Sequence, residues 1–74
     1  MQVEELKKRV SEYGGVERLL LNLNKKGIVM SRTSYFRKLK GKTEFTRKEL
    51  LGMADELSLN DKDIYIIFFS KEVS

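Results

Sequence analysis

Nine lysine and arginine side chains lie between residues 25 and 48, where Glu44 is the only acid. The rest of the chain carries six basic and ten acidic side chains, so a net charge of +8 in this segment contrasts with −4 elsewhere. Cations gathered in one segment of a small chain are typical of a surface that binds polyphosphate. A solvated charged face is the other interpretation that the charge allows, because small domains often expose many lysines.

The sequence contains few of the side chains that catalysis or metal binding requires. The chain has no cysteine and no histidine, which excludes thiol catalysis and disulfides and removes the usual zinc ligands and general bases. The acids outside the basic segment, among them Asp55, Glu56, Asp61 and Asp63, are expected at helix surfaces or caps with no phosphate loop beside them. We therefore expect no enzyme, no metal, no cofactor and no small-molecule substrate.

Length and hydropathy indicate one soluble domain. A chain of 74 residues, taken as a single domain over 1–74, is close to the lower limit for a self-sufficient hydrophobic core. The N-terminal residues mix acids and bases, and the longest apolar run is only residues 64–69, so neither export nor a membrane span is expected. The lack of cysteine agrees with a reducing compartment, and we expect a cytoplasmic location in a bacterium.

Apolar residues at spacings of three and four predict an all-α fold of five helices. The first helix is expected to end at the Gly14-Gly15 pair, and the second to run over about residues 16–26 and end at Gly27. The stripes expected to be buried are Val3, Leu6, Val10 and Tyr13 in the first helix and Val16, Leu19, Leu20 and Leu23 in the second.

A short cationic helix is predicted next. Residues 28–30 indicate a tight buried turn, Ser31 is a favourable N-cap, and the helix that follows is expected to end at Gly41. Tyr35 and Leu39 are expected on its inner face, with Phe36 at the edge of the core. The outer surface is expected to carry Arg32, Thr33, Ser34, Arg37 and Lys38.

Two more helix starts are visible. Thr46 and Glu49 have the spacing of a capping box for a helix that buries Leu50, Met53, Ala54 and Leu57. Asn60 and the acids that follow it are suited to the N-terminus of a fifth helix.

Residues 64–69 suit a strand as well as a helix, and the preceding cap favours a helix. Of these, Tyr65, Ile66 and Phe69 are expected to be partly exposed, either as a dimer surface or as the edge of the core.

The second and third predicted helices, joined by a short turn with a glycine, have the sequence form of a helix-turn-helix. The run SRTSYFRKLKGKTEFTRKELLGMADELSL, from Ser31 to Leu59, resembles the phage-repressor and Cro-like helix-turn-helix family of XRE type. In that family the recognition helix ends in a basic residue, leucine, a polar residue and glycine, here residues 38–41. The ending IYIIFFSKEVS is similar to the tails of small regulators of Gram-positive phage and mobile elements. The resemblance covers the chain from about residue 16 onward.

The resemblance implies a compact five-helix regulator whose recognition helix, about residues 31–40, enters the major groove of operator DNA as part of a homodimer. The implied base-reading residues are Arg32, Thr33 and Arg37, with Ser34 nearby. An arginine can donate two hydrogen bonds to a guanine, so Arg32 and Arg37 are expected to carry the most specificity. The implied phosphate contacts are Ser31, Lys38, Lys40 and Lys42.

Two features depart from the family pattern. Three apolar residues lie between Gly27 and Ser31 where the family has one, and Leu23 stands where the family commonly has alanine. Both bear on the angle at which the recognition helix is presented. A protein-binding adaptor of the same fold, similar to an antirepressor or antitoxin, is the alternative function.

Overall fold

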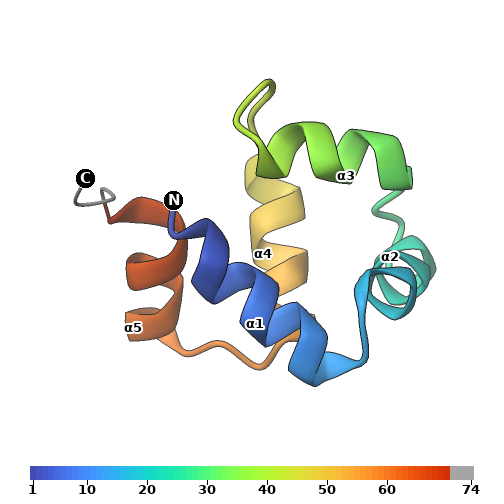
Figure 1. The fold of residues 1–74 in the computed structure, drawn as a ribbon. Coiled ribbons are helices and arrows are strands. Elements are labelled where there is room, and N and C mark those ends of the chain that lie inside the picture. Colours follow the sequence, from blue (N-terminus) through green and yellow to red (C-terminus); the bar gives the residue numbers. More distant parts are fainter. Residues whose placement is uncertain (71–74) are drawn as a thin grey trace.

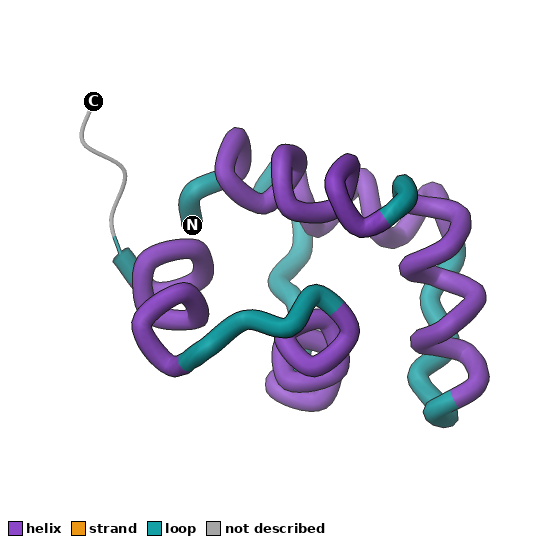
Figure 2. The backbone as a smooth tube through the Cα atoms, turned by 90° about the horizontal axis from the view of Figure 1, so that it is seen from below, coloured by secondary structure: helices purple, strands orange, loops and turns teal. Residues whose placement is uncertain are grey.

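The computed structural model describes residues 1–70. These residues form helices joined by turns and loops, and they contain no strand. In chain order the helices are α1 (Val3–Tyr13), α2 (Val16–Lys25), α3 (Arg32–Leu39), α4 (Arg47–Glu56) and α5 (Asp61–Ile64), and α5 continues as the π-helix η1 (Tyr65–Phe69). They surround one core, and the N-terminus lies beside η1 (Figure 1 and Figure 2). The predicted all-α class with five helices is thus confirmed for the described residues. No helix among these residues has the length and hydropathy needed to cross a membrane.

Glycines follow the first two helices, as the sequence predicts. Gly14 and Gly15 have φ angles of 129° and 99°, and the backbone N–H of each donates to the carbonyl of Val10. Gly27, with a φ of 84°, follows α2. Because side chains with a Cβ rarely adopt such angles, glycine can end these helices without strain. Both α2 and α3 are slightly shorter than predicted, ending at Lys25 and Leu39.

Side-chain caps begin the last three helices. The Ser31 hydroxyl accepts a hydrogen bond from the backbone N–H of Ser34 at the start of α3. The capping box predicted for α4 is present, since Thr46 and Glu49 each accept a hydrogen bond from the other's backbone N–H. Asn60 caps α5 in the same way, which confirms it as a helix start. These local bonds fix where each helix begins and therefore which face turns inward.

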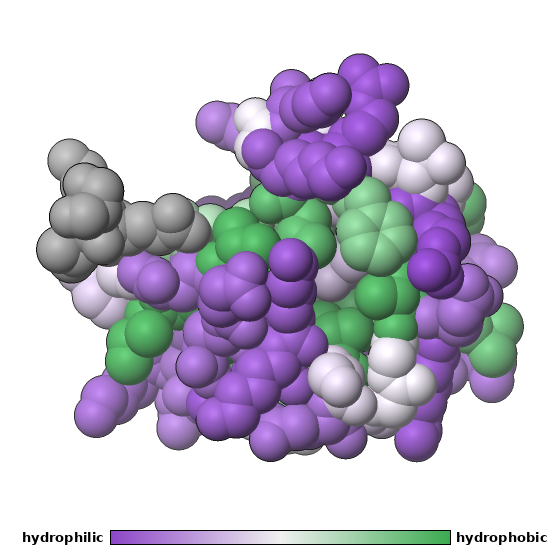
Figure 3. Space-filling view, in the orientation of Figure 1, coloured by the Kyte–Doolittle hydropathy of each residue, from purple (hydrophilic) through white to green (hydrophobic). Residues whose placement is uncertain are grey.

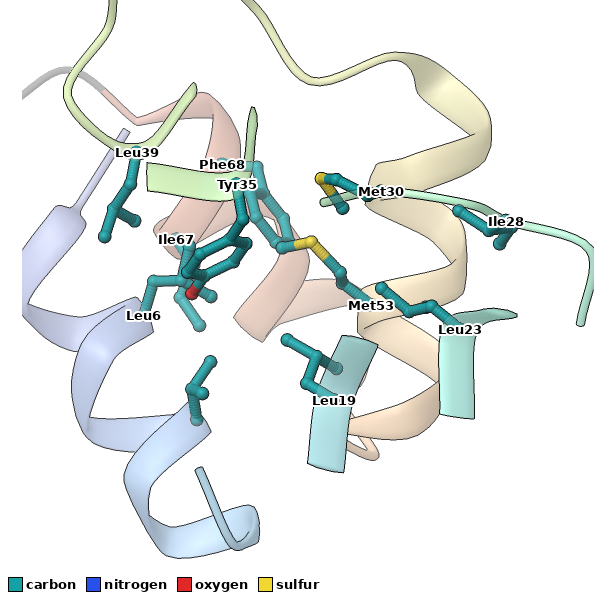
Figure 4. Close-up of a cluster of buried hydrophobic side chains, with 11 residues drawn as sticks. Leu6, Leu19, Leu23, Ile28, Met30, Tyr35, Leu39, Met53, Ile67 and Phe68 are labelled. Carbon is teal, nitrogen blue, oxygen red and sulfur yellow. The ribbon is translucent and has the colours of Figure 1, made fainter. Parts of the chain in front are cut away.

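The core contains side chains from every helix except α5, together with two from the turn before α3. Figure 4 shows Tyr35 of α3 reaching in toward Leu6 and Ile67, and Tyr35 is 1% exposed. Leu39 is also buried and Phe36 is half-buried, so the predicted inner face of α3 is confirmed. The buried cluster consists of Leu6, Val10, Leu19, Leu23, Ile28, Met30, Tyr35, Leu39, Met53, Ile67 and Phe68. Because Tyr35 anchors α3 from within, the opposite face of that helix is turned to solvent.

Gly52 of α4 explains how the fold accommodates the long turn and the bulky Leu23. A Cβ at position 52 would collide with the end of the Ile28 side chain and lie 3.1 Å from Leu23 Cδ2. The missing side chain therefore gives these two residues their space between α2 and α4. The buried turn is correct for Ile28 and Met30 but wrong for Val29, which is 79% exposed. The alternation places residues 28 and 30 on one side and residue 29 on the other, as in an extended segment.

The segment from Ile64 to Phe69 is helical, as the Asn60 cap favours, but it is wider than an α-helix. The backbone N–H of Ser70 donates to the carbonyl of Tyr65 at 2.9 Å, five residues earlier. Ile67 and Phe68 face the core, whereas Tyr65, Ile66 and Phe69 are exposed, as predicted for these three side chains. The backbone N–H of Gln2 donates to the carbonyl of Ile67 at 2.7 Å and holds the N-terminus against η1.

A polar network joins α1, α2 and α4 on the side away from α3. The Tyr13 hydroxyl donates to Glu56 Oε1 at 2.6 Å and accepts from Asn22 Nδ2 at 2.5 Å. Lys26 Nζ lies 2.5 Å from the other oxygen of Glu56 and also pairs with Asp55. The bonds from Lys26 and Tyr13 hold the pKa of Glu56 below its usual value. Three helices are thereby tied together by charge-assisted hydrogen bonds.

Candidate nucleic-acid interface

The outer face of α3 lies along one edge of the molecule, and the loop of residues 40–46 projects beyond it (Figure 1). In Figure 3 the projecting part of this edge is hydrophilic, and paler side chains lie beside it. Of the side chains predicted to read bases or hold phosphates, the exposed ones are Ser31, Arg32, Thr33, Arg37, Lys40 and Lys42. Ser34 is half-buried, and the Lys38 side chain is mostly buried. Helix α3 thus gathers most of the predicted side chains on one surface.

Two shallow hollows meet along the crest of α3, the line that Thr33 and Arg37 form on this surface. Thr33 and Arg37, four residues apart on α3, line both of them. One hollow is completed by Arg32, Phe36, Lys40 and Lys42, and the other by Ser31, Ser34, Lys38 and Thr43. Arg37 therefore stands between the two hollows, with the cations of residues 40 and 42 on one side of it.

The cations on this face differ in what they contact. Within residues 1–70, Arg37, Lys40 and Lys42 form no ion pair. Arg32, by contrast, lies with its Nη1 atom 2.5 Å from Glu17 Oε1 of α2. The Arg32 guanidinium also lies over the Phe36 ring, 5.2 Å from its centroid. Arg37, Lys40 and Lys42 are consequently the cations available to an incoming anion without breaking a contact.

Lys38 does not lie on the outer surface, so that expectation is wrong. Its Nζ atom is 2.6 Å from both carboxylate oxygens of Glu49, and the two side chains are only 13% and 11% exposed. Position 38 follows the buried Tyr35 by three residues and precedes the buried Leu39, so helical geometry sets it beside the inner face. Its charge is used to join α3 to the N-terminus of α4.

The Glu49 carboxylate has two roles at once. Its burial alone would raise its pKa, but hydrogen bonds from Lys38 and from the Thr46 backbone N–H outweigh this effect, and the pKa lies below the usual value. The carboxylate therefore stays ionised near neutral pH and keeps Lys38 neutralised. In the core behind it, burial raises the pKa of the Tyr35 hydroxyl.

The sequence does not predict the two carboxylates that form ion pairs with cations of α3. The sequence marks Glu49 only as part of a capping box, and it gives no sign that Glu17 lies beside Arg32. The capping box does signal that Glu49 points back toward the preceding loop, because its side chain must reach Thr46. No comparable local signal links Glu17 to Arg32, which lie fifteen residues apart in the sequence.

No protein-family model matches the chain, and comparisons with the curated proteins and with the solved structures found no match. Within residues 1–70 there is also no group of three or more acidic, histidine or cysteine side chains placed to hold a metal ion.

A second exposed surface lies on η1. Tyr65 is 64% exposed and Phe69 62%, and Ile66 lies between them in sequence. Phe69 also lines a hollow that Phe45 and Leu50 border from the start of α4. Lys38, Gly41 and Thr43 line the same hollow, so the apolar surface extends from η1 toward α4 and borders the loop after α3.

Proposed function

We propose that the chain is a sequence-specific, double-stranded DNA-binding transcriptional regulator with a phage-repressor-like helix-turn-helix fold. Helices α2 and α3 are the helix-turn-helix, and α3 is the recognition helix. The observation that carries the proposal is the two-sidedness of α3. Tyr35 and Leu39 hold the helix from within, whereas Arg37 and, just after the helix, Lys40 and Lys42 face outward and form no ion pair within residues 1–70. A major groove about 12 Å wide admits one such helix, supported from behind.

The outer residues have separate tasks in this proposal. Arg37 and Thr33 on the crest read base edges, together with Arg32 and, to a smaller extent, the half-buried Ser34. Lys40 and Lys42 contact phosphates and supply affinity rather than sequence choice.

Two residues have smaller parts than the family resemblance implies. Lys38 takes no part in phosphate binding, because Glu49 already neutralises it. The Ser31 hydroxyl already caps α3, so only the N-terminal end of the helix is open to a phosphate there.

A homodimer completes the proposal. One small module makes few base contacts, so useful specificity requires two copies on a pseudo-palindromic operator with half-sites about 34 Å apart. The exposed apolar side chains of Tyr65, Ile66 and Phe69 on η1 are the proposed contact between the copies.

The alternative is a protein-binding adaptor, and the same η1 surface is the observation that favours it. A salt titration separates the two functions. A protein that contacts several phosphates loses DNA affinity steeply as salt rises, whereas an adaptor binds DNA weakly at every salt concentration.

The decisive experiment selects bound duplexes from a random pool and compares Arg37→Ala with Lys42→Ala on the selected site and on random DNA. We expect Arg37→Ala to weaken the free energy of binding to the selected site by about 1–3 kcal/mol and to affect binding to random DNA much less. Lys42→Ala should weaken both alike and reduce the salt slope by about one. Equal losses from Arg37→Ala on the two duplexes would overturn its assignment as a base reader, and the absence of any enriched sequence would overturn the proposed function.

A further inference from the structure

Glu17 is the exposed carboxylate that pairs with the outer face of α3 within residues 1–70. It is the second residue of α2, and it meets Arg32, the first residue of α3, at 2.5 Å. Both side chains are well exposed, at 82% and 59%. An ion pair in such a position is worth about 0–1 kcal/mol, so the fold has little need of it.

The position of Arg32 makes the pair more informative. The N-terminus of a helix carries a partial positive charge, which makes the first residue of α3 an unfavourable place for an arginine. Glu17 offsets that charge from one side, and the Phe36 ring covers one flat face of the guanidinium at 5.2 Å. These two contacts therefore favour one orientation of the Arg32 side chain while its charge is balanced.

Charge and hydrogen-bonding capacity are separated by this arrangement. A guanidinium has five N–H donors, and Glu17 engages only the Nη1 group of Arg32. The remaining donors can still reach a guanine, whose acceptors are neutral and demand correct geometry. Attraction to phosphates depends instead on net charge, and a balanced Arg32 adds little of it.

We propose, building on the DNA-binding function above, that Glu17 is a specificity-determining positioning residue that makes Arg32 a base reader with little affinity for phosphates. On random DNA the Glu17 carboxylate removes a phosphate attraction. On the operator it keeps the guanidinium oriented for its base. Both effects widen the gap between specific and non-specific binding.

The test replaces Glu17 by glutamine, which keeps an oxygen acceptor for Arg32 but removes the charge. The dissociation constants of Glu17→Gln and of the wild type are measured on the selected duplex and on random duplex over a range of salt concentrations. Random DNA should bind about threefold to tenfold more tightly with a steeper salt dependence, because one more cation is free to contact phosphates. Affinity for the selected duplex should rise less, because the freed charge of Arg32 is offset by the loss of its favoured orientation toward the base. The specificity ratio should fall by about threefold, the scale of one exposed ion pair.

Glu12→Gln is the matched control, because Glu12 is exposed on α1 and forms no ion pair within the described residues. It makes the same change in net charge and should alter both duplexes by the same factor. If Glu17→Gln also changes both duplexes equally, the inference is wrong while the DNA-binding function stands. If the wild type itself prefers no duplex, the proposed function fails and the inference fails with it. Both variants should unfold at the wild-type midpoint, which separates a positioning role from a structural one.

Discussion

The cations of the scaffold and those on the outer face of α3 differ in what surrounds them. Arg9 bonds to two carboxylates at 3.0 and 3.3 Å, and Lys38 lies 2.6 Å from a buried glutamate. Arg37, Lys40 and Lys42 have no such partner in the part of the chain that the structure describes. Side chains of the same type therefore serve two purposes within one small fold.

The difference shows that a count of charges overstates a binding surface. Between residues 25 and 48 the excess of cations suggests one continuous patch. Lys26 and Lys38, within that segment, are occupied by acids from α4, and only part of the segment is available to a ligand. A cation that is largely buried against an acid, as Lys38 is, stabilises the fold, and an exposed cation without a partner can contact a phosphate.

The largest expected effect comes from breaking the buried pair of Lys38 and Glu49. Lys38→Ala leaves the Glu49 carboxylate buried and without its cation, which should lower the free energy of unfolding by about 3 kcal/mol. Urea denaturation followed by circular dichroism measures the loss. Adding Glu49→Gln in the same chain should restore part of it, because the unpaired charge is then removed.

Lys40→Ala is the control for this prediction, since Lys40 is two residues away and exposed. It should change stability by less than about 0.5 kcal/mol. In DNA binding the order should reverse. Lys40→Ala should reduce the salt slope by about one, whereas Lys38→Ala, studied where it is folded, should leave the slope unchanged. Similar stability losses for the two variants would contradict the division between scaffold and surface cations.

Much of the fold was predictable because its signals are local. Glycines that end α1 and α2, and the caps at Ser31, Thr46 and Asn60, act within one turn of the chain and are visible in the sequence. The inner face of α3 follows from the helical period alone. The π-helical form of η1 was not predicted, because neither its composition nor its cap distinguishes a hydrogen bond five residues back from one four residues back.

The candidate site was predictable only in part, for a similar reason. The exposure of Arg37, Lys40 and Lys42 follows from the period of α3 and the loop after it. The occupation of Lys38 by Glu49 and of Arg32 by Glu17 depends on how separate helices pack, since each pair joins two helices. Helix packing, rather than composition, decides which cations remain free.

The second largest expected effect is the contribution of the Glu56 carboxylate to stability, which depends on pH. The folded pKa of Glu56 is lowered by its bonds from Lys26 and Tyr13, so its contribution to stability is present above the unfolded pKa of about 4.3 and is lost as pH falls through the folded pKa. Glu56→Gln should therefore cost about 1.5 kcal/mol at pH 7, where a charged hydrogen bond is lost. The difference from wild type should shrink as pH falls through the folded pKa, because the wild-type carboxyl then becomes neutral as well.

Urea denaturation at a series of pH values provides the measurement for Glu56. Glu12→Gln again serves as control, because the exposed Glu12 forms no ion pair within residues 1–70. Its stability should follow the wild-type pH profile throughout. A Glu56→Gln profile parallel to that of the wild type would mean that the carboxylate contributes no pH-dependent stability.

The smallest effect compares two tyrosine hydroxyls, one in the scaffold network and one on the exposed η1 surface. Tyr13→Phe removes the bonds to Glu56 and Asn22 but keeps the ring under Arg18, whose guanidinium carbon lies 5.0 Å from its centroid. The free energy of unfolding should fall by about 1 kcal/mol, the usual net value of such hydrogen bonds. Tyr65→Phe should cost less than about 0.5 kcal/mol, because that hydroxyl is exposed. Equal losses, measured by thermal unfolding at low protein concentration, would contradict the expectation that the bonded Tyr13 hydroxyl stabilises the fold more than the exposed Tyr65 hydroxyl.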